Sequence, residues 1–551
     1  MKKEPAQSRL EAVNLSSYPP ALGETEETGG SLSQDDVIRR LFAPASNLPQ
    51  PRNKQAIVVV SAGTERAVTH SQLENLLAHG IEQLKERGVK EGAKVVFYCE
   101  NCPELSSTIL ACWALNAMAV LIDYRAERAD VLAMSKKLGA KLLLTSKKLY
   151  KTFVSETKLF TEEGLDVLDV SAFADFKDTA HKSQFDIETL DLDRPAFAIL
   201  TSGTTGTPKT SVHNLRSLVR NVIDLADATD LQGNMTALTP LPISHIFGLS
   251  VLLVTQVLGL KTVMTELEPV GFVKAVYRYK PQLIAALPQF YGALLAAPDG
   301  FIDLTDARLL LCGGAPLAVS LANKFEKKFG KRLNNGYGST ESKIVALNKD
   351  GPALSVGKPV GSVTIDIVNE QDEVLPDGEE GEVRITSSML MDGYINNEKE
   401  TNKVLHNGHY YTGDIGRFED GNLFVVGRKG DIVIVGGVVV QAGEVEEALR
   451  NYPEVKEVAV TAVQNKQLGQ IIKASVVLMD DKIADKLKSD NRNESLEAQR
   501  QLQRQFRAFC KEHLSRYKRP MKWEFLGPDD NLPKTLAGKI DKKTMSSAKP
   551  K

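Results

Sequence analysis

A run of small hydroxyl residues and glycines, closed by a lysine, is the segment of this sequence that most clearly suits chemistry. It reads Ala198-Ile-Leu-Thr-Ser-Gly-Thr-Thr-Gly-Thr-Pro-Lys209 and continues the apolar segment PAFAIL, which is typical of a buried strand. Glycines let successive backbone N–H groups point into one concavity that binds anionic oxygens, while hydroxyls and Lys209 add donors and charge. Pro208 stands where the P-loop pattern needs its second glycine. We therefore predict a phosphate loop of another kind, leading into a helix, rather than a surface linker.

Eight further motifs accompany this loop over nearly 500 residues. They are LPISHIFGL (241–249), LCGGAPL (311–317), NNGYGSTES (334–342), GEEGEV (378–383), YYTGDIG (410–416), GRKGDIVIVGG (427–437), YKRP (517–520) and LPKTLAGKI (532–540). With these motifs in this order, the chain resembles the adenylate-forming superfamily, which includes acyl- and aryl-CoA synthetases, peptide-synthetase adenylation domains and luciferase.

The resemblance implies a reaction and its cofactors. Members of the superfamily activate a carboxylate with ATP, which gives an acyl-adenylate and pyrophosphate. Many then transfer the acyl group to the thiol of CoA or of a carrier-protein pantetheine. A carboxylate that attacks a phosphate must overcome charge repulsion, so catalysis would consist mainly of positioning and charge neutralisation. ATP, Mg²⁺ and CoA, or a carrier-protein phosphopantetheine, are the implied cofactors.

The resemblance also implies how the nucleotide is held. Tyr337 would stack on adenine, and Asp414 would accept both ribose hydroxyls because a carboxylate offers two oxygens. Arg428 would also reach the ribose. The other residues expected to contact the nucleotide are Thr201, Ser202, Gly203, Thr204, Thr205, Gly206 and Lys209 around the phosphates, and Gly314, Ala315, Pro316, Gly336 and Gly338 near the base.

Five residues are expected, by the same resemblance, to act on the reacting groups or the metal. Thr340 would contact the α-phosphate, and Glu341 would hold Mg²⁺ through a carboxylate oxygen, with Thr204 as a second metal ligand. Lys539 would bridge the carboxylate and the α-phosphate, where its charge offsets the developing negative charge. With His245, the residues Lys539, Thr340 and Glu341 form the expected catalytic set.

The motif around His245 bears on the substrate. By resemblance, His245 gates the acyl pocket or lies beside the reacting carboxylate, which is already ionised near pH 7 and needs no general base. Relatives that activate amino acids carry an Asp in this motif, whereas no Asp or Glu occurs between Met235 and Met264. The other pocket segments are mostly apolar, so we expect an aliphatic or aryl acid without a free α-amine. The expected pocket residues are His245, Phe247, Gly248, Gln289 and Gly313.

The expected pivot between two domains departs from the family pattern. The family rotates its small C-terminal domain about the residues after the GR motif, here Lys429 and Gly430. Gly430 stands where Asp or Lys is usual, and Val438-Val439 follows Gly436-Gly437 where a polar residue is usual. Rotation stays feasible because glycine is permissive, but contacts with the incoming thiol are in doubt. In the GSTE segment, Ser339 is a milder departure from the family pattern.

The wider sequence predicts the elements that position these residues. Strand-length apolar segments alternate with helical patterns: strands at 56–61, 94–98, 119–122 and 141–145, and helices at 71–87, 104–115 and 129–138. This alternation favours an α/β fold with doubly wound, mostly parallel sheets. From 360 to 426 short strands and turn signals indicate an antiparallel, β-rich subdomain. A small α+β domain follows and would rotate on the hinge.

These patterns give the expected domain organisation. Residues 1–34 are polar and read as a mobile arm, 35–428 as the large ATP- and acid-binding domain, 429–430 as the hinge, and 431–551 as the small domain with the catalytic lysine. Within the small domain, the almost wholly polar segment 480–504 reads as a surface insert.

Composition limits the classes of partner that the chain is expected to bind. With 551 residues and a formal net charge of −2, the chain gives no general reason to expect nucleic acid. Its apolar runs are too short to span a membrane, and its five cysteines suit a reducing, cytoplasmic compartment. Cys99 and Cys102 lack the second pair that a zinc site needs. The basic residues Arg516, Lys518, Arg519 and Lys522 read as a solvated face or as contacts for the phosphates of a thiol donor.

Three functions remain in view. The first is an acyl-CoA synthetase that takes a small-molecule carboxylic acid. The second is a stand-alone adenylating enzyme that passes its acyl group to an acyl carrier protein or an amine. The third, a non-catalytic nucleotide-binding sensor or scaffold, is disfavoured because Lys539, Thr340, Glu341 and the phosphate loop are all present. The sequence does not predict the oligomeric state.

Overall fold

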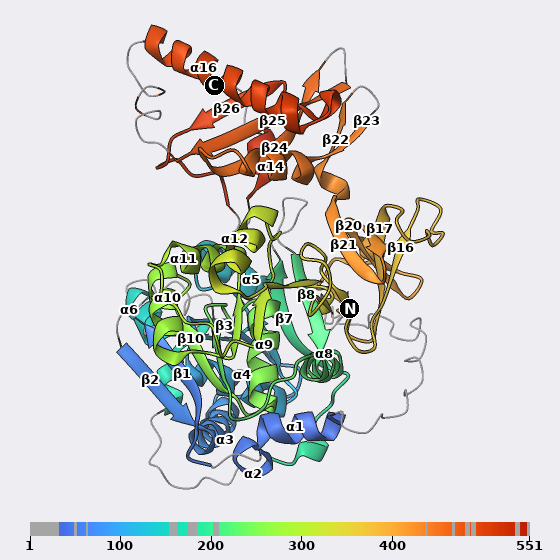
Figure 1. The fold of residues 1–551 in the computed structure, drawn as a ribbon. Helices are drawn as coiled ribbons and strands as arrows, with labels where there is room; N and C mark the ends of the chain where they lie inside the picture. Colours follow the sequence, from blue (N-terminus) through green and yellow to red (C-terminus); the bar gives the residue numbers. More distant parts are fainter. Residues whose placement is uncertain are drawn as a thin grey trace, which may run out of the picture.

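A computed structural model gives the fold as a large domain with a smaller domain set beside it (Figure 1). The small domain lies at the end of the large domain that carries α12 (Val319–Phe329), and the backbone N–H of Val319 donates to Glu447 Oε1 of the small domain at 3.1 Å. The structure describes residues 32–48, 52–61, 64–153, 164–174, 185–201, 209–435, 438–465, 469–479, 485, 487, 492–534 and 540–547. The expected N-terminal arm lies outside these residues up to position 31.

Two mostly parallel sheets form the large domain. The first sheet has the described strand order β15 (Lys358–Pro359), β14 (Lys343–Leu347), β13 (Asn334–Ser339), β12 (Leu309–Cys312), β11 (Leu283–Ala286), β9 (Thr236–Thr239), β10 (Lys261–Thr265), β1 (Gln55–Ser61) and β2 (Thr64–Thr69). The second has the order β18 (Gly393–Tyr394), β8 (Lys209–Asn214), β7 (Pro195–Thr201), β4 (Met118–Leu121), β3 (Lys94–Tyr98), β5 (Leu142–Thr145) and β6 (Asp166–Asp169). Antiparallel pairs occur at the ends of both orders.

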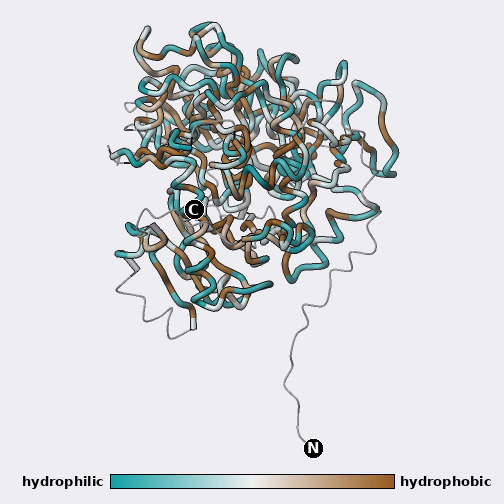
Figure 2. Tube along the Cα trace, turned by 90° about the horizontal axis from the view of Figure 1, so that it is seen from below, coloured by the Kyte–Doolittle hydropathy of each residue, from teal (hydrophilic) through white to brown (hydrophobic). Residues whose placement is uncertain are grey.

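Strand periodicity explains why helices cover both faces of each sheet. In β3, Val95 and Phe97 face one hydrophobic core while Val96 and Tyr98 face another, as the two-residue period of a strand requires. Both sheets contribute to the first core, which also includes α3 (His70–Glu86), α4 (Pro103–Ala114), α8 (Leu215–Ala228) and α9 (Ile246–Val257). The outer faces are covered by α10 (Pro269–Tyr279), α11 (Pro288–Ala296) and α12, and by α5 (Arg128–Leu138) and α6 (Lys147–Phe153). Hydrophobic, brown segments accordingly gather where the trace is densest (Figure 2).

The remaining short helices of the large domain lie at its edges. They are α1 (Gln34–Phe42), α2 (Pro44–Asn47), α13 (Glu398–Val404) and the 3₁₀ turns η2 (Val170–Ala174) and η3 (Ile187–Thr189). The predicted α/β fold class is confirmed, and the predicted strands and helices between 56 and 145 agree with the structure to within a few residues at each end. All five cysteines are free. Among the described residues, no helix has the length and apolar character needed to cross a bilayer.

The predicted antiparallel subdomain is also present. Its strands are β16 (Thr364–Val368), β17 (Gly381–Thr386), β19 (Leu405–His406), β20 (His409–Glu419) and β21 (Asn422–Arg428), and every pairing among them is antiparallel. β21 ends at Arg428, and the short η4 (Lys429–Asp431) then leads the chain into the small domain. The expected hinge residues therefore lie in a single 3₁₀ turn between the two domains.

The small domain packs helices on one further sheet. Its elements are β22 (Ile432–Val435), β23 (Val438–Gln441), α14 (Ala442–Arg450), β24 (Val455–Asn465), β25 (Gly469–Leu478), α16 (Arg492–His513), η5 (Arg516–Lys518), β26 (Lys522–Leu526) and α17 (Lys542–Ser547). Residues 492–504 belong to α16, whose Leu502, Phe506 and Cys510 are buried in the core of this domain. Within the predicted insert, residues 493–501 are exposed or half-buried and Leu502 is buried, so this part is a surface helix that meets the core at its last turn.

The element after the phosphate loop also differs from the prediction. The loop leads into a strand, β8, which pairs antiparallel with β7 from Pro195↔Asn214 to Thr201↔Lys209. The helix α8 begins only after Asn214, whose side chain caps it by accepting from the N–H of Ser217. The loop thus closes a hairpin at the end of β7. Its residues 202–208, with Ser202, Gly203, Thr204, Thr205 and Gly206, lie outside the described part of the chain, as does the side chain of Thr201.

Candidate functional site

A cavity of about 200 Å³ lies at the carboxyl ends of strands from both large sheets. Ligands of open α/β sheets bind at this edge, because the loops that follow parallel strands gather there. Segments after β4, β9, β10, β11 and β12 contribute to the wall, and β13 with the turn that follows it closes one side. Side chains and backbone of Asp123, Arg125, Ser244, His245, Phe247, Leu287, Gly313, Gly314, Gly336, Tyr337, Gly338, Thr340 and Lys343 are among those that line the cavity.

Asp414 joins three parts of the chain next to this cavity. Its Oδ2 accepts a hydrogen bond of 2.7 Å from the hydroxyl of Tyr337, and its Oδ1 accepts one of 2.7 Å from Nε of Arg428. The carboxylate is 8% exposed. Asp414 holds the pKa of the Arg428 guanidinium above its ordinary value, and burial raises the pKa of Tyr337 well above the usual range. The three expected nucleotide residues are therefore brought together, with both carboxylate oxygens engaged.

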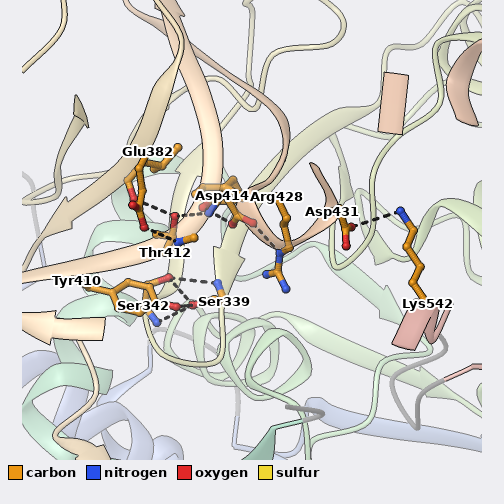
Figure 3. Close-up of polar contacts among 12 residues, drawn as sticks. Ser339, Ser342, Glu382, Tyr410, Thr412, Asp414, Arg428, Asp431 and Lys542 are labelled. Carbon is orange, nitrogen blue, oxygen red and sulfur yellow. Dashed lines mark hydrogen bonds and ion pairs between the residues drawn. The ribbon is translucent and has the colours of Figure 1, made fainter. Parts of the chain in front are cut away.

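Neighbouring strands fix the place of Asp414 (Figure 3). Its backbone N–H donates to Thr412 Oγ1 at 3.0 Å, and the N–H of Gly413 donates to Glu382 Oε1 at 3.0 Å. Gly413 has φ +71°, a conformation that glycine adopts without strain. Glu382 also pairs with Lys429 of the expected hinge, at 3.4 Å. The bulge that presents Asp414 is thus linked to the point where the chain leaves the large domain.

The turn that carries Thr340 and Glu341 is closed by two serines. The N–H of Ser339 donates to Ser342 Oγ at 3.1 Å, the N–H of Ser342 donates to Ser339 Oγ at 3.1 Å, and Ser339 Oγ donates to the hydroxyl of Tyr410 at 3.3 Å (Figure 3). Ser339, which looked like a mild variation in the sequence, therefore has a structural role. Thr340 lines the cavity, where the turn holds it in place.

Glu341 is held by a second segment of the large domain. Its Oε1 accepts from the hydroxyl of Tyr394 at 2.7 Å, and its backbone oxygen accepts from the N–H of Met391 at 2.8 Å. Burial and the charge of Glu341 raise the pKa of Tyr394. One carboxylate oxygen of Glu341, Oε2, has no hydrogen bond from the described residues. A single carboxylate of this kind suits Mg²⁺, which is commonly bound by one or two carboxylates together with substrate phosphates.

Tyr394 also borders the lysine of the phosphate loop. Lys209 forms an ion pair with Glu400 of α13, and its Nζ lies 4.9 Å from the centre of the Tyr394 ring. The contact with Lys209 lowers the pKa of Glu400. The ammonium group expected to bind phosphate thus already has an anionic neighbour in this structure.

A buried lysine, Lys343, anchors the end of the Thr340–Glu341 turn. Its Nζ contacts His213 Nδ1 at 3.0 Å and Ser217 Oγ at 3.1 Å, and it donates to the backbone oxygen of Met389. Lys343 has φ +63°, a left-handed conformation that is uncommon for a residue with a side chain. Burial lowers the pKa of Lys343 to about 7. No sequence motif pointed to this residue.

Glycines let the backbone approach closely along the same wall. A Cβ on Gly338 would lie 2.0 Å from the backbone oxygen of Lys343, and one on Gly336 would lie 3.0 Å from Leu311. Gly314 has φ +76°, which favours glycine in the loop after β12. Ala315 and Pro316 continue this loop without being part of the cavity wall. Of the small residues expected beside the base, the three glycines therefore border one side of the site.

The expected acyl-pocket residues separate into two groups. His245, Phe247 and Gly313 line the cavity. Gly248 is packed in α9, where a Cβ would lie 2.2 Å from the oxygen of Pro242, and Gln289 is exposed on α11 outside the cavity wall. Sequence reasoning missed Asp123 and Arg125, which line the cavity from the segment after β4. The one sequence signal for these two residues was the presence of a charged residue directly after a predicted buried strand.

Other expected residues lie outside the described part of the chain or away from the cavity. Lys539, Gly436, Gly437 and the side chain of Val439 are not described, so their predicted roles stay predictions. In the basic cluster, Lys518 pairs with Glu444 and Arg519 donates to the backbone oxygen of Leu514 at 2.9 Å. Among the described residues, no group of three or more His, Cys, Asp or Glu side chains could hold a metal ion.

The burial of Lys343 predicts a pH dependence of stability. Its pKa is about 7 in the folded protein and 10.5 in its ordinary state, so between these values the unfolded chain binds more protons. Stability should therefore rise with pH from about 7 towards 10, by up to about 1.4 kcal/mol per pH unit. Lys343→Met should lose this rise, as measured by urea unfolding at pH 7, 8, 9 and 10.

The matched control is Asp392→Asn. Asp392 is a buried acid whose pKa burial raises to about 7, and the positive charge of Lys343 acts on it. Removing this carboxylate should leave a rise above pH 7, because the lysine remains. A rise of the same size in Lys343→Met and in the parent protein would show that Lys343 is not its source.

Comparisons with known proteins agree with this architecture. The family model for the AMP-binding enzyme matches residues 46–395, more than half of the chain, and the model for the AMP-binding enzyme C-terminal domain matches residues 444–539. A 2-succinylbenzoate–CoA ligase of Bacillus licheniformis is 30% identical over 471 residues, covering 83% of this chain and 90% of that protein.

Solved structures give the same fold. An o-succinylbenzoate CoA synthetase of Bacillus subtilis, in complex with an acyl-adenylate intermediate, has a TM-score of 0.78 at 24% identity and covers 93% of this chain and 98% of its own. The amide bond synthetase McbA of Marinactinospora thermotolerans has a TM-score of 0.76 at 25% identity, with 94% and 99% covered. From the matched models and the shared architecture, this chain belongs to the AMP-binding enzyme family.

Proposed function

We propose that this protein activates an aliphatic or aryl carboxylic acid with ATP and then transfers the acyl group to the thiol of CoA. The observation that carries the proposal is the placement of Thr340. It lines the cavity with His245 and directly follows β13, which carries Tyr337; Tyr337 is bonded to Asp414 and through it to Arg428. An acid in the cavity and a nucleotide on that network would therefore meet at Thr340.

The cavity wall supports an acid without a free α-amine. Its described lining is largely aliphatic and aromatic, as is usual for a small-molecule site. One carboxylate, Asp123, does line it, but Arg125 and His245 are both bonded to this carboxylate. An ammonium group would have to displace these donors, so the cavity does not favour an amino acid.

Each residue has a defined part in the proposed reaction. Asp414 and Arg428 would hold the ribose, and Lys209 with the undescribed loop 202–208 would hold the β- and γ-phosphates. Thr340 would contact the α-phosphate as the carboxylate attacks it and pyrophosphate leaves. Glu341 would hold Mg²⁺, which supplies positive charge beside the phosphates. Lys539 would neutralise charge at the reacting carboxylate, and it would arrive with the small domain.

The molecule that accepts the acyl group is less well defined by the observations than the activation step. The 2-succinylbenzoate–CoA ligase relative favours CoA, whereas the likeness to an amide bond synthetase keeps an amine, or a carrier-protein thiol, as the second candidate. Val438 of β23 is exposed, and the resemblance would place a polar residue near it for contact with the incoming thiol. Transfer to the thiol of CoA or of a carrier protein would need a rotation of the small domain about Lys429 and Gly430.

The role of Lys539 is testable by substitution. Lys539→Ala should lower carboxylate-dependent exchange of labelled pyrophosphate into ATP by about 100-fold or more, because the charge that neutralises the attacking carboxylate is lost. ATP binding, measured by calorimetry, should change by less than about threefold.

The matched control is Lys534→Ala. Lys534 lies in the same segment and pairs with Glu457 at the surface at 2.9 Å. Its substitution should leave exchange near the parent rate. Full exchange activity in Lys539→Ala would contradict the assignment of this lysine, and absence of exchange with every acid in the parent protein would contradict the function itself.

The ion pair between Lys209 and Glu400 gives another expectation. A bound triphosphate must replace Glu400 as the partner of Lys209, so Glu400→Gln should tighten binding of ATP with Mg²⁺. Exposed ion pairs are worth about 0.2–1 kcal/mol, and because this pair is half-buried we expect the upper value, which corresponds to a decrease in Kd of about fivefold. Glu398→Gln changes an exposed carboxylate of the same helix and should leave Kd unchanged. Equal or weaker ATP binding in Glu400→Gln would contradict the exchange of partners.

A further inference from the structure

His245 is bonded to an acidic residue from a distant part of the chain. Its Nε2 lies 2.6 Å from Oδ2 of Asp123, and the two residues are 122 positions apart in sequence. The Asp123 side chain is 5% exposed, and that of His245 is 27% exposed. Both residues line the same cavity. The contact therefore joins the segment after β4 to the residue that precedes α9.

Arg125 fixes the carboxylate of Asp123 in place. Its guanidinium donates from Nε to Oδ1 at 2.8 Å and from Nη2 to Oδ2, and its backbone N–H donates to Oδ1 at 2.9 Å. A two-pronged contact of this kind sets the plane of the carboxylate as well as its position. Burial alone would raise the pKa of Asp123, but the hydrogen bonds from Arg125 and His245 outweigh burial and hold this pKa below its usual range. Asp123 is therefore a fixed anion.

A fixed anion at Nε2 determines the chemistry of the imidazole. An ionised carboxylate only accepts hydrogen bonds, so Nε2 must carry the proton. Among the described residues no group is bonded to the other nitrogen, Nδ1. Nδ1 is an acceptor in the neutral ring and a donor in the imidazolium ion.

We propose that Asp123 is a positioning residue for acid activation, which holds the His245 ring at the cavity wall through Nε2, so that the imidazolium form of the ring can donate from Nδ1 to the substrate carboxylate. This inference rests on the proposed function for the identity of the substrate, but the state of the imidazole does not depend on it. Arg125 takes part by fixing Asp123. The other charged or titratable groups that line the cavity are Tyr337 of β13 and Lys343 of β14.

The tautomer of His245 can be observed directly. The full-length protein, with its eight histidines labelled with ¹³C and ¹⁵N, is studied by NMR at alkaline pH, and His245 is assigned from the signal lost in His245→Asn. In the parent protein the neutral ring should be protonated on Nε2. In Asp123→Asn the fraction of this tautomer should fall, because an amide side chain can donate to Nε2 as well as accept from it. An unchanged fraction, or a neutral ring protonated on Nδ1 in the parent protein, would overturn the proposal.

A double-mutant cycle then tests the effect on the reaction. Asp123→Asn should lower kcat/KM for the acid about tenfold or more, while KM for ATP stays within about twofold. In a His245→Asn background the same substitution should have little further effect, because Asp123 acts through His245. A loss of the same size in both backgrounds would show a general structural role and contradict the inference.

Further variants serve as controls for specificity and for folding. Asp193→Asn removes another carboxylate that binds an arginine in two-pronged fashion, the exposed pair with Arg216, and should change neither measurement. Asp123→Glu keeps a carboxylate that only accepts hydrogen bonds, and it should restore most of the Nε2-protonated tautomer if Asp123→Asn is folded. If Asp123→Asn does not fold, Arg125→Gln serves in its place, since a loosened carboxylate should still lower kcat/KM for the acid in the parent but not in the His245→Asn background.

The NMR and kinetic experiments separate this inference from the proposed function. If no acid is activated but the His245 tautomer behaves as expected, the proposed function is wrong and the pairing of Asp123 with His245 stands. If acids are activated but neither the tautomer nor the mutant cycle depends on Asp123, this inference is wrong and the proposed function stands.

Discussion

The hydrogen bonds to the carboxylate of Asp414 are the contacts on which the arrangement of this site depends most. One oxygen binds Tyr337 of β13, from the nine-stranded sheet, and the other binds Arg428, the last residue of β21 before the chain enters the small domain. Hydrogen bonds to a charged group are worth about 1.5–3 kcal/mol each, and breaking one here would leave a buried partner unsatisfied. In the proposed reaction, ribose hydroxyls would share or replace these donors. Nucleotide binding and the path of the chain into the small domain would then be linked through one carboxylate.

A second set of contacts holds the reacting residues against the same wall. The turn with Thr340 and Glu341 is closed by Ser339 and Ser342, and Lys343 ties its end to elements of the seven-stranded sheet and α8. The buried ammonium costs solvation energy, which its three hydrogen-bonding contacts offset in part. The turn therefore has little freedom before any ligand binds. Such preorganisation is what a reaction limited by charge repulsion needs, because groups that are already in place do not have to be ordered in the transition state.

Local pattern predicted much of this architecture, and long-range contacts account for what it missed. The alternation of strands and helices, and motifs such as NNGYGSTES and YYTGDIG, placed Tyr337, Thr340 and Asp414 because each motif keeps its residues at fixed spacing. The strand β8 was missed, since KTSVHN is short and a helix follows it. The first half of α16 was read as an insert because its apolar stripe is narrow. Asp123 could not be paired with His245 from sequence, since only the packing of two distant strand ends brings them together. Lys343 was missed for a similar reason, because the neighbouring sequence does not indicate that this lysine is buried.

The central claim is that one site joins a carboxylic acid to ATP and passes it to CoA. Its most direct test is pyrophosphate release by the full-length protein across a panel of aliphatic and aryl acids, each with and without CoA, with the acyl product identified by mass spectrometry. We expect release to depend on the acid, to be faster with CoA, and to be accompanied by an acyl-CoA in equal amount. Acid-dependent release that stops at one equivalent of bound adenylate whatever the CoA concentration would contradict CoA as the acceptor, and release independent of every acid would contradict the whole account.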